Sequence, residues 1–203
     1  MIVKIIPLLL LVTVSSAQQN VIERYSSGTV RAQGEMINGL KNGTWKYFYP
    51  SGGKLAVEHF ISGKLDGLVT YYYPNGEVQA VENWIGGSLS DTSRYYYASG
   101  TMEKIGAYRQ SQYEGKWKHF YENGGLERVL HYQNGLPQGE VRIFDEEGNL
   151  VQLGFYENGE EHGHWEFYDA EGRLTYSGAY KHGEREGTWF EYDRKGRRKE
   201  WKY

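Results

Sequence analysis

The chain has 203 residues, enough for one domain, and its 26 acidic and 23 basic side chains give a formal net charge of −3. This mild acidity argues against a nucleic acid as partner, and the absence of cysteine excludes both a disulfide framework and a lipid-attachment site. Glycine and tyrosine are abundant, at 27 and 19 residues, so the composition favours short strands joined by tight turns.

Residues 1–17 have the pattern of a secretory signal peptide. Lys4 is followed by the apolar run Ile5–Val14, and the small residues that precede and include Ala17 offer a cleavage site. A membrane anchor is the alternative, but this run is shorter than the roughly 20 residues that span a bilayer. We therefore expect cleavage near Ala17, a secreted or periplasmic protein, and no stable membrane span after cleavage.

From residue 18 onward the chain is organised around a repeat of 24 residues. Glycines recur at this interval in three interleaved series, and we number the positions of a repeat from 1 to 24, starting at Gly43. The chain then divides into a partial N-terminal capping repeat (18–42), six repeats (43–186) and a partial C-terminal capping repeat (187–203). Atypical repeats are expected at the ends of such an array.

Each repeat is predicted to form a β-hairpin of two strands. Aromatic residues dominate positions 6 and 18, with Trp or Val at most copies of position 3, and they lie between clusters of turn residues. The first turn, Tyr49–Gly52 at positions 7 to 10, has Pro50 where a type I turn prefers it. Gly52 closes the turn, where a three-residue hairpin loop needs a left-handed residue.

This turn also predicts the strand register. Position 7 should face position 11, so position 6 should face 12, as in Tyr72 and Val78, and position 3 should face 15, as in Trp45 and Val57. The sequence therefore predicts an all-β fold, an elongated twisted antiparallel β-meander of about seven to eight 24-residue hairpin repeats.

Two segments depart from the pattern. In repeat 91–114, Asp91 and Ser111 replace glycines and Ser93 replaces Trp or Val, which indicates either sequence drift or a bend or partner site midway along the ribbon. The basic segment Arg197–Tyr203 is interpreted as a charged last strand that protects an open sheet edge, in preference to a nucleic-acid site.

The repeat resembles the MORN repeat family in its bacterial variant form, over nearly all of residues 20–203. The residues that carry the resemblance are Tyr180, Gly183, Gly187, Thr188, Trp189 and Tyr192, and again Tyr132, Gly135 and Gly139. The resemblance implies a scaffold, an oligomerisation surface or a platform that binds lipid or protein. Some bacterial relatives are labelled antitoxins, but a signal peptide departs from a cytoplasmic antitoxin role.

The best candidates for function are tyrosines on the odd positions of one sheet face. Aromatic rings with a polar tip are favoured at interfaces, so this ladder could hold a protein partner, a glycan or another copy of the chain. The alternative is that the rings pack on one another and hold the sheet together. The candidate residues are Tyr47, Tyr49, Tyr71, Tyr73, Tyr95, Tyr97 and Tyr121.

No constellation of residues points to catalysis, a cofactor or a metal. His162, His164 and His182 lie near glutamates in neighbouring loops, but polar loop positions are ordinary solvated residues. The leading hypothesis is an exported, non-enzymatic repeat protein that serves as a binding or scaffolding surface. The alternative is an antitoxin or immunity-type protein that neutralises a partner toxin.

Overall fold

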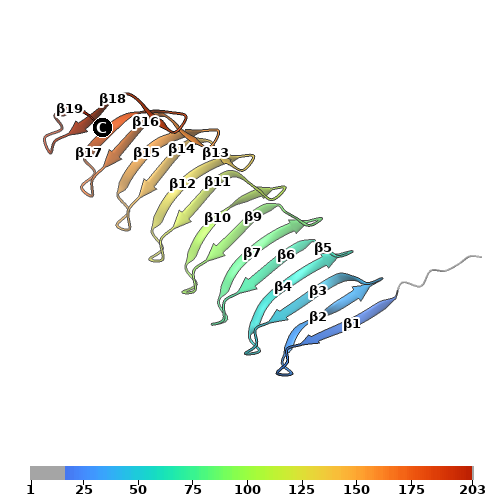
Figure 1. The fold of residues 1–203 in the computed structure, drawn as a ribbon. Helices are drawn as coiled ribbons and strands as arrows, with labels where there is room; N and C mark the ends of the chain where they lie inside the picture. Colours follow the sequence, from blue (N-terminus) through green and yellow to red (C-terminus); the bar gives the residue numbers. More distant parts are fainter. Residues whose placement is uncertain (1–16, 203) are drawn as a thin grey trace, which may run out of the picture.

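The computed structural model describes residues 17–202, and every regular element in this range is a β-strand. Each longer strand pairs antiparallel with the longer strands before and after it in the chain, so the predicted meander is confirmed as one open sheet. Figure 1 shows a long row of bowed hairpins from β1 to β19, with the two kinds of turn on opposite long edges. The predicted signal peptide lies outside the described residues, apart from Ala17. No helix in residues 17–202 could cross a membrane.

The strands vary from two to nine residues in length. They are β1 (Gln18–Arg24), β2 (Val30–Ile37), β3 (Leu40–Phe48), β4 (Lys54–Ile61), β5 (Lys64–Leu65), β6 (Gly67–Tyr72), β7 (Val78–Ile85), β8 (Ser88–Leu89), β9 (Asp91–Tyr96), β10 (Met102–Arg109), β11 (Gln112–Phe120), β12 (Leu126–Gln133), β13 (Leu136–Pro137), β14 (Gly139–Phe144), β15 (Leu150–Glu157), β16 (Glu160–Tyr168), β17 (Leu174–Lys181), β18 (Glu184–Tyr192) and β19 (Arg198–Trp201).

The tight turn at positions 7 to 10 has the predicted geometry. The amide of Gly52 donates to the carbonyl of Tyr49 at 2.8 Å, and the amide of Tyr49 donates to the carbonyl of Gly53 at 2.8 Å. Gly52 has φ 88°, a left-handed conformation in which a Cβ atom would be strained. The closing glycine of this turn is therefore a backbone requirement.

The register beyond the turn differs from the prediction by one residue. Position 6 faces position 12, as predicted, for example Phe48 opposite Lys54. The next pair joins positions 5 and 14, so position 13 is the extra residue of a β-bulge. Trp45 consequently faces Glu58 and not Val57, and the predicted pairing of positions 3 and 15 is wrong. The same shift in the other hairpins places positions 3, 5, 14, 16 and 18 on one face, which we call the tryptophan face.

A second irregularity follows each connection between repeats. The connection is a two-residue turn in which both residues have positive φ, as at Asn38 (52°) and Gly39 (77°), the signature of a type I′ hairpin. The strand that leaves it then bulges, because the three residues 43–45 lie opposite Gly34 alone. This bulge interrupts several strands, which is why β5, β8 and β13 are separate short elements.

The bulge folds a tryptophan over a glycine of the preceding repeat. A Cβ atom on Gly34 would lie only 2.4 Å from Cδ2 of Trp45, whose indole Nε1 donates to the carbonyl of Glu35 at 2.9 Å. The same pairing of position 16 with position 3 of the next repeat occurs at Gly106/Trp117, Gly154/Trp165 and Gly178/Trp189. Where position 3 is smaller, position 16 carries a side chain, as in Glu58/Val69, Glu82/Ser93 and Leu130/Val141.

A large residue at position 3 is matched by glycine at position 16 of the preceding repeat, and a smaller residue by a side chain there. Position 3 is therefore buried in every repeat between 43 and 202. Trp45, Trp117 and Trp189 have exposed fractions of 1%, 0% and 1%. Tyrosines of position 18 cover them edge-on, as Tyr180 covers Trp189 with ring centroids 5.0 Å apart. The core is thus a line of rings along the tryptophan face, and each repeat is held by its neighbours.

The irregular repeat 91–114 keeps the backbone of the others. Its strands pair on both sides without a break in the sheet. Asp91 (φ 61°) and Ser111 (φ 64°) adopt the left-handed conformations that glycine adopts at these positions in the other repeats. The bend considered from the sequence is therefore absent from the pairing pattern.

Candidate binding surface

The seven candidate tyrosines fall into two groups with different contacts. In the first group, at position 7, each hydroxyl donates to the backbone carbonyl 23 residues further along, in the next repeat. These bonds are Tyr49 to Tyr72 (2.7 Å), Tyr73 to Tyr96 (2.8 Å), Tyr97 to Phe120 (2.8 Å) and Tyr121 to Phe144 (2.7 Å). They tie each tight turn to the next hairpin, so these four residues brace the sheet.

The second group, at position 5, forms a row on the tryptophan face. Tyr47, Tyr71 and Tyr95 come from β3, β6 and β9, and alanines of β4 and β7 pair with them in the strands between. The paired order along the ribbon is Ala32, Tyr47, Ala56, Tyr71, Ala80 and Tyr95. Because the rings recur at every second strand, they are spaced at about 9.6 Å. We call Tyr47, Tyr71 and Tyr95 the tyrosine row, and the alanines between its rings, Ala56 and Ala80, are buried.

Two carboxylates accompany the tyrosine row. Glu58 follows Ala56 on β4, between Tyr47 and Tyr71, and Glu82 follows Ala80 on β7, between Tyr71 and Tyr95. The side chain of Glu82 accepts hydrogen bonds from the Tyr95 hydroxyl (2.9 Å) and from Nε1 of Trp84 (3.0 Å), and only 9% of the residue is exposed.

The carboxylates and burial together suppress ionisation of the tyrosine row. Burial first, then the charges of Glu82 and Glu58, raises the pKa of Tyr71 to about 12. Burial and the hydrogen bonds of its hydroxyl to Tyr108 and Glu82 raise the pKa of Tyr95 further. The rings therefore stay neutral hydrogen-bond donors at any physiological pH.

Beyond Tyr95 the same line of paired positions carries basic side chains. Lys104 and Arg128 replace the alanines of position 14, and His119 replaces the next tyrosine. Nζ of Lys104 lies 4.6 Å from the ring centroid of Tyr95. Burial, followed by the charges of Arg128 and Lys104, lowers the pKa of His119 to about 4. The acidic, aromatic part of the tryptophan face thus ends at a basic boundary.

The histidines of the C-terminal loops do not converge on a metal site. The rings of His162 and His182 are 5.9 Å apart, and each faces a different carboxylate: His162 lies 3.4 Å from Glu157, and His182 lies 3.2 Å from Glu160. Among residues 17–202 no group of three or more such side chains could hold an ion.

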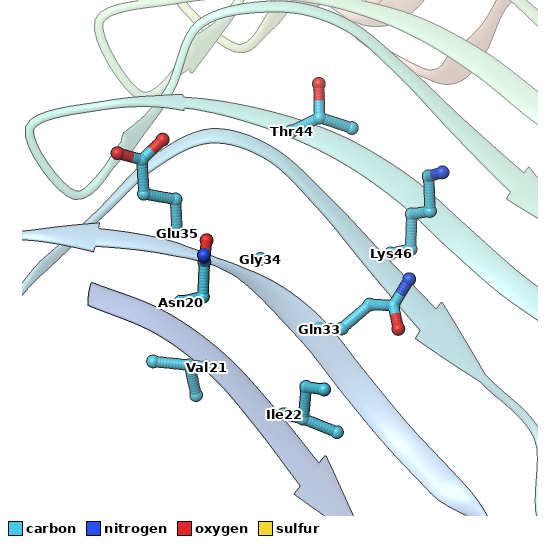
Figure 2. Close-up of a pocket in the computed structure, with 8 residues that line it drawn as sticks. All are labelled: Asn20, Val21, Ile22, Gln33, Gly34, Glu35, Thr44 and Lys46. Carbon is cyan, nitrogen blue, oxygen red and sulfur yellow. The ribbon is translucent and has the colours of Figure 1, made fainter. Parts of the chain in front are cut away.

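The opposite face carries shallow hollows behind the bulges. A groove of about 490 Å³ lies between β1, β2 and β3. Figure 2 shows the residues that line it, among them Gly34, Glu35 and Lys46. A similar hollow of about 440 Å³ surrounds Gly154. Both lie where the facing strand bulges so that a tryptophan covers a glycine on the other face. The hollows are a consequence of that packing.

The sequence groups the tyrosines of positions 5 and 7 into one ladder, because both positions are odd in the repeat, and the structure separates them by their contacts. Glu58 and Glu82 are not among the residues that the sequence singles out. The signal for the carboxylates was present in the sequence: position 16 is glycine when the next position 3 is tryptophan, and holds a side chain otherwise. Reading it required the bulge at position 13, which places position 16 on the same face as position 5.

Comparison with known proteins identifies four of the repeats. The family model described as MORN repeat variant matches residues 41–61, 65–85, 113–134 and 137–158. These four segments are therefore similar to MORN repeats, and each of them forms a β-hairpin in the structure. No curated protein matches the chain.

Solved structures align with the chain only at low identity and low TM-score. Those titled "Crystal Structure of TcdB2-TccC3" and "Crystal Structure of TcdB2-TccC3-Cdc42" align with 86% of this chain at 11% and 10% identity, with TM-scores of 0.20 and 0.21. The chain spans about 13% of the length of those proteins.

Proposed function

We propose that this chain is an exported, non-enzymatic MORN-type repeat protein that presents the tryptophan face as a binding or scaffolding surface for a protein partner. The observation that carries the proposal is the contrast between the two groups of tyrosines. The position-7 hydroxyls donate to backbone carbonyls and brace the sheet, whereas the rings of the tyrosine row are half-buried beside the carboxylates of Glu58 and Glu82.

The architecture supports a role in binding. Both faces of a single-layer sheet are available to partners, and MORN-type repeats fill most of the chain between residues 41 and 158. The tyrosine row combines rigid rings with hydrogen-bonding tips, which is the composition favoured at protein interfaces. Burial and neighbouring carboxylates raise the pKa of Tyr71 and Tyr95, so these tyrosines are poor acids at neutral pH, which supports a non-enzymatic role.

Export is tested by locating the protein and its N-terminus. We expect the mature chain in the periplasm or medium, with a mass that corresponds to cleavage near Ala17. Retention of the full-length chain in the cytoplasm would contradict the export proposal and favour the antitoxin alternative.

Binding is tested by pull-down from cell-envelope extract with three proteins: wild type, Tyr71→Ala/Tyr95→Ala, and Lys116→Ala/Lys118→Ala on the opposite face. We expect a protein that wild type and the lysine variant retain and the tyrosine variant loses, with circular dichroism unchanged. Equal retention by all three would contradict the assignment of the surface.

A further inference from the structure

We propose that the two ends of the sheet join copies of this chain head to tail, with β19 of one copy paired antiparallel to β1 of the next. The proposal goes beyond the binding role above and rests on the proposed export only for the mature chain, which begins at Gln18. The features that lead to it are the kinds of strand at the two ends, the direction of their outer backbone groups and the side chains that would meet.

The strands at the two ends are of the two kinds that alternate along the sheet. Figure 1 shows β1 and β19 at opposite ends of the ribbon, and among residues 17–202 β1 pairs with β2 alone and β19 with β18 alone. β1 is the first strand of a hairpin and β19 is the second. Between repeats, a second strand pairs antiparallel with the next first strand, as β4 does with β6. β19 followed by β1 of another copy therefore continues the order of the sheet.

The outer edge of β1 presents backbone groups in a defined phase. The amide of Asn38 donates to the carbonyl of Ala17 at 3.0 Å, and the pairing with β2 runs without a bulge from there to Glu23. Because hydrogen-bonded pairs alternate along an antiparallel ladder, the odd-numbered residues of this stretch bond to β2. The amides and carbonyls of Asn20 and Ile22 therefore point away from β2, towards the open edge.

The outer edge of β19 has the matching phase. The amide of Asp193 donates to the carbonyl of Arg197 at 3.0 Å, and β19 then pairs with β18 without a bulge. The amide and carbonyl of Glu200 therefore point outwards. Because the bulge at position 13 is absent, Glu200 and Trp201 occupy the places of positions 15 and 16. Glu200 opposite Ile22 of the next copy would thus repeat the register of positions 15 and 4 between repeats.

On the tryptophan face this register brings Trp201 to Val21 of the next copy. In the other repeats a smaller residue at position 3 is matched by a side chain at position 16 of the preceding repeat, as in Leu130/Val141. Val21 is at position 3, and it is the one residue at this position between 17 and 202 that is only partly buried. Trp201 packs 6.2 Å from the ring of Trp189 and would supply the neighbour that Val21 lacks.

The same register joins two ion pairs into a row of alternating charges. Lys199 lies 3.0 Å from Glu191 at the end of one copy, and Glu23 lies 2.6 Å from Arg31 at the start of the next. Lys199 would lie opposite Glu23, on the tryptophan face. The order of charges across the joint is then negative, positive, negative and positive, which favours the pairing.

The basic last strand selects between the two edges. Two β19 strands would bring their basic side chains, Arg198 and Lys199, together, whereas β1 offers Glu23 to Lys199. Arg198 would approach Arg24 of the next copy only beyond the bulge of the β1–β2 pairing, where the new pairing ends. The contact joins two different surfaces, so each added copy leaves one open edge of each kind and the chain can grow.

The test uses two variants of the mature chain, each with one edge blocked. Asn20→Pro and Glu200→Pro each remove an amide that points away from the neighbouring strand, so neither proline removes a hydrogen bond within the sheet. Wild type and the opposite-face variant Lys116→Ala/Lys118→Ala are the controls. The mass of each protein, and of an equimolar mixture of the proline variants, is measured against concentration by sedimentation velocity.

We expect wild type and the lysine variant to form dimers, trimers and longer species as concentration rises. Each proline variant should stay monomeric alone, and their mixture should form a dimer and nothing larger, because only one productive joint remains. Glu23→Lys should weaken assembly about three- to tenfold, and Lys199→Glu in the same chain should restore it.

A wild type that stays monomeric at its highest soluble concentration would overturn the proposal. So would a Glu200→Pro variant that still dimerises, which would show that β1 pairs with β1, or a mixture with no more dimer than its components. If a proline variant loses its circular dichroism signal, Glu23→Lys and Lys199→Glu replace the pair, and their mixture should associate more strongly than either alone. A monomeric wild type that still retains the envelope partner would leave the proposed function in place and remove only this inference.

Discussion

The pairing of glycine with tryptophan makes Gly106→Ala a severe test of the packing. A methyl group at residue 106 would lie 2.1 Å from Cδ2 and 2.3 Å from Cε2 of Trp117, far inside van der Waals contact. Trp117 is fully buried, and its Nε1 donates to the carbonyl of Ala107 at 3.0 Å. The ring also packs edge-on to Tyr113 with centroids 4.3 Å apart, so it has no space to shift sideways.

The expected loss of unfolding free energy follows from the contacts that the Trp117 indole would lose. Swinging Trp117 out exposes about 150–250 Å² of ring, worth about 4–6 kcal/mol at 25 cal/mol per Å². A displaced ring would keep part of that contact, and it would lose one hydrogen bond worth about 1 kcal/mol. We therefore expect Gly106→Ala to lower the free energy of unfolding by about 3–5 kcal/mol, comparable to removing a buried tryptophan.

The assay is urea unfolding followed by circular dichroism. Gly53→Ala is the matched control, because its Cβ would meet only Ser51 Oγ at 3.7 Å, and it should change stability by less than about 0.5 kcal/mol. A cost below about 1 kcal/mol for Gly106→Ala would refute the packing argument.

A rescue can be designed from the protein itself. The double variant Gly106→Leu/Trp117→Val copies the pair Leu130/Val141. Its loss of unfolding free energy should therefore be smaller than the sum of the losses of the two single variants, by a coupling energy of about 2–3 kcal/mol. Additive costs would show that the two positions do not exchange volume.

Three further predictions concern the turns and the basic boundary. Tyr73→Phe removes the 2.8 Å bond to the Tyr96 carbonyl and should lower unfolding free energy by about 1 kcal/mol; an unchanged urea midpoint would contradict the bracing role. Asp91→Gly relieves a left-handed conformation with φ 61° and should raise stability by about 0.5–1 kcal/mol, whereas a lower melting temperature would contradict it. Burial lowers the pKa of His119 to about 4 in the folded chain. Between about pH 6.5 and pH 4 the histidine is therefore protonated in the unfolded chain and neutral in the folded chain. Stability should therefore fall as pH drops from about 6.5 towards 4, by about 1 kcal/mol after solvent screening of the half-exposed ring. The variant His119→Gln should lose this part of the slope, and equal slopes would contradict the assignment.

The repeat period and the turn chemistry were sufficient to predict the fold. Gly52 and its equivalents require a left-handed conformation, so the hairpins and the 6/12 register followed from local rules. The bulge at position 13 did not follow, because no residue type marks it: Leu55 is an ordinary strand residue. The one-residue shift that it causes decides which face each returning side chain occupies.

The candidate site was predicted only in part for the same reason. Tyr71 and Tyr73 both occupy odd positions of the repeat, so the sequence gives them the same role. In the structure the Tyr73 hydroxyl bonds to the next hairpin, whereas the Tyr71 ring lies in the tyrosine row beside Glu82. Distinguishing them requires knowing which backbone carbonyl lies within reach across the sheet. That is a property of register, which composition and spacing do not carry.

The division of the tyrosines into bracing and binding groups is tested most directly by comparing Tyr73→Phe/Tyr97→Phe with Tyr71→Ala/Tyr95→Ala, measuring both the urea midpoint and retention of the envelope partner. We expect the first variant to unfold at a lower urea concentration and to keep the partner, and the second variant to lose the partner while it remains folded. Loss of the partner in the first variant, or its retention in the second, would contradict the assignment.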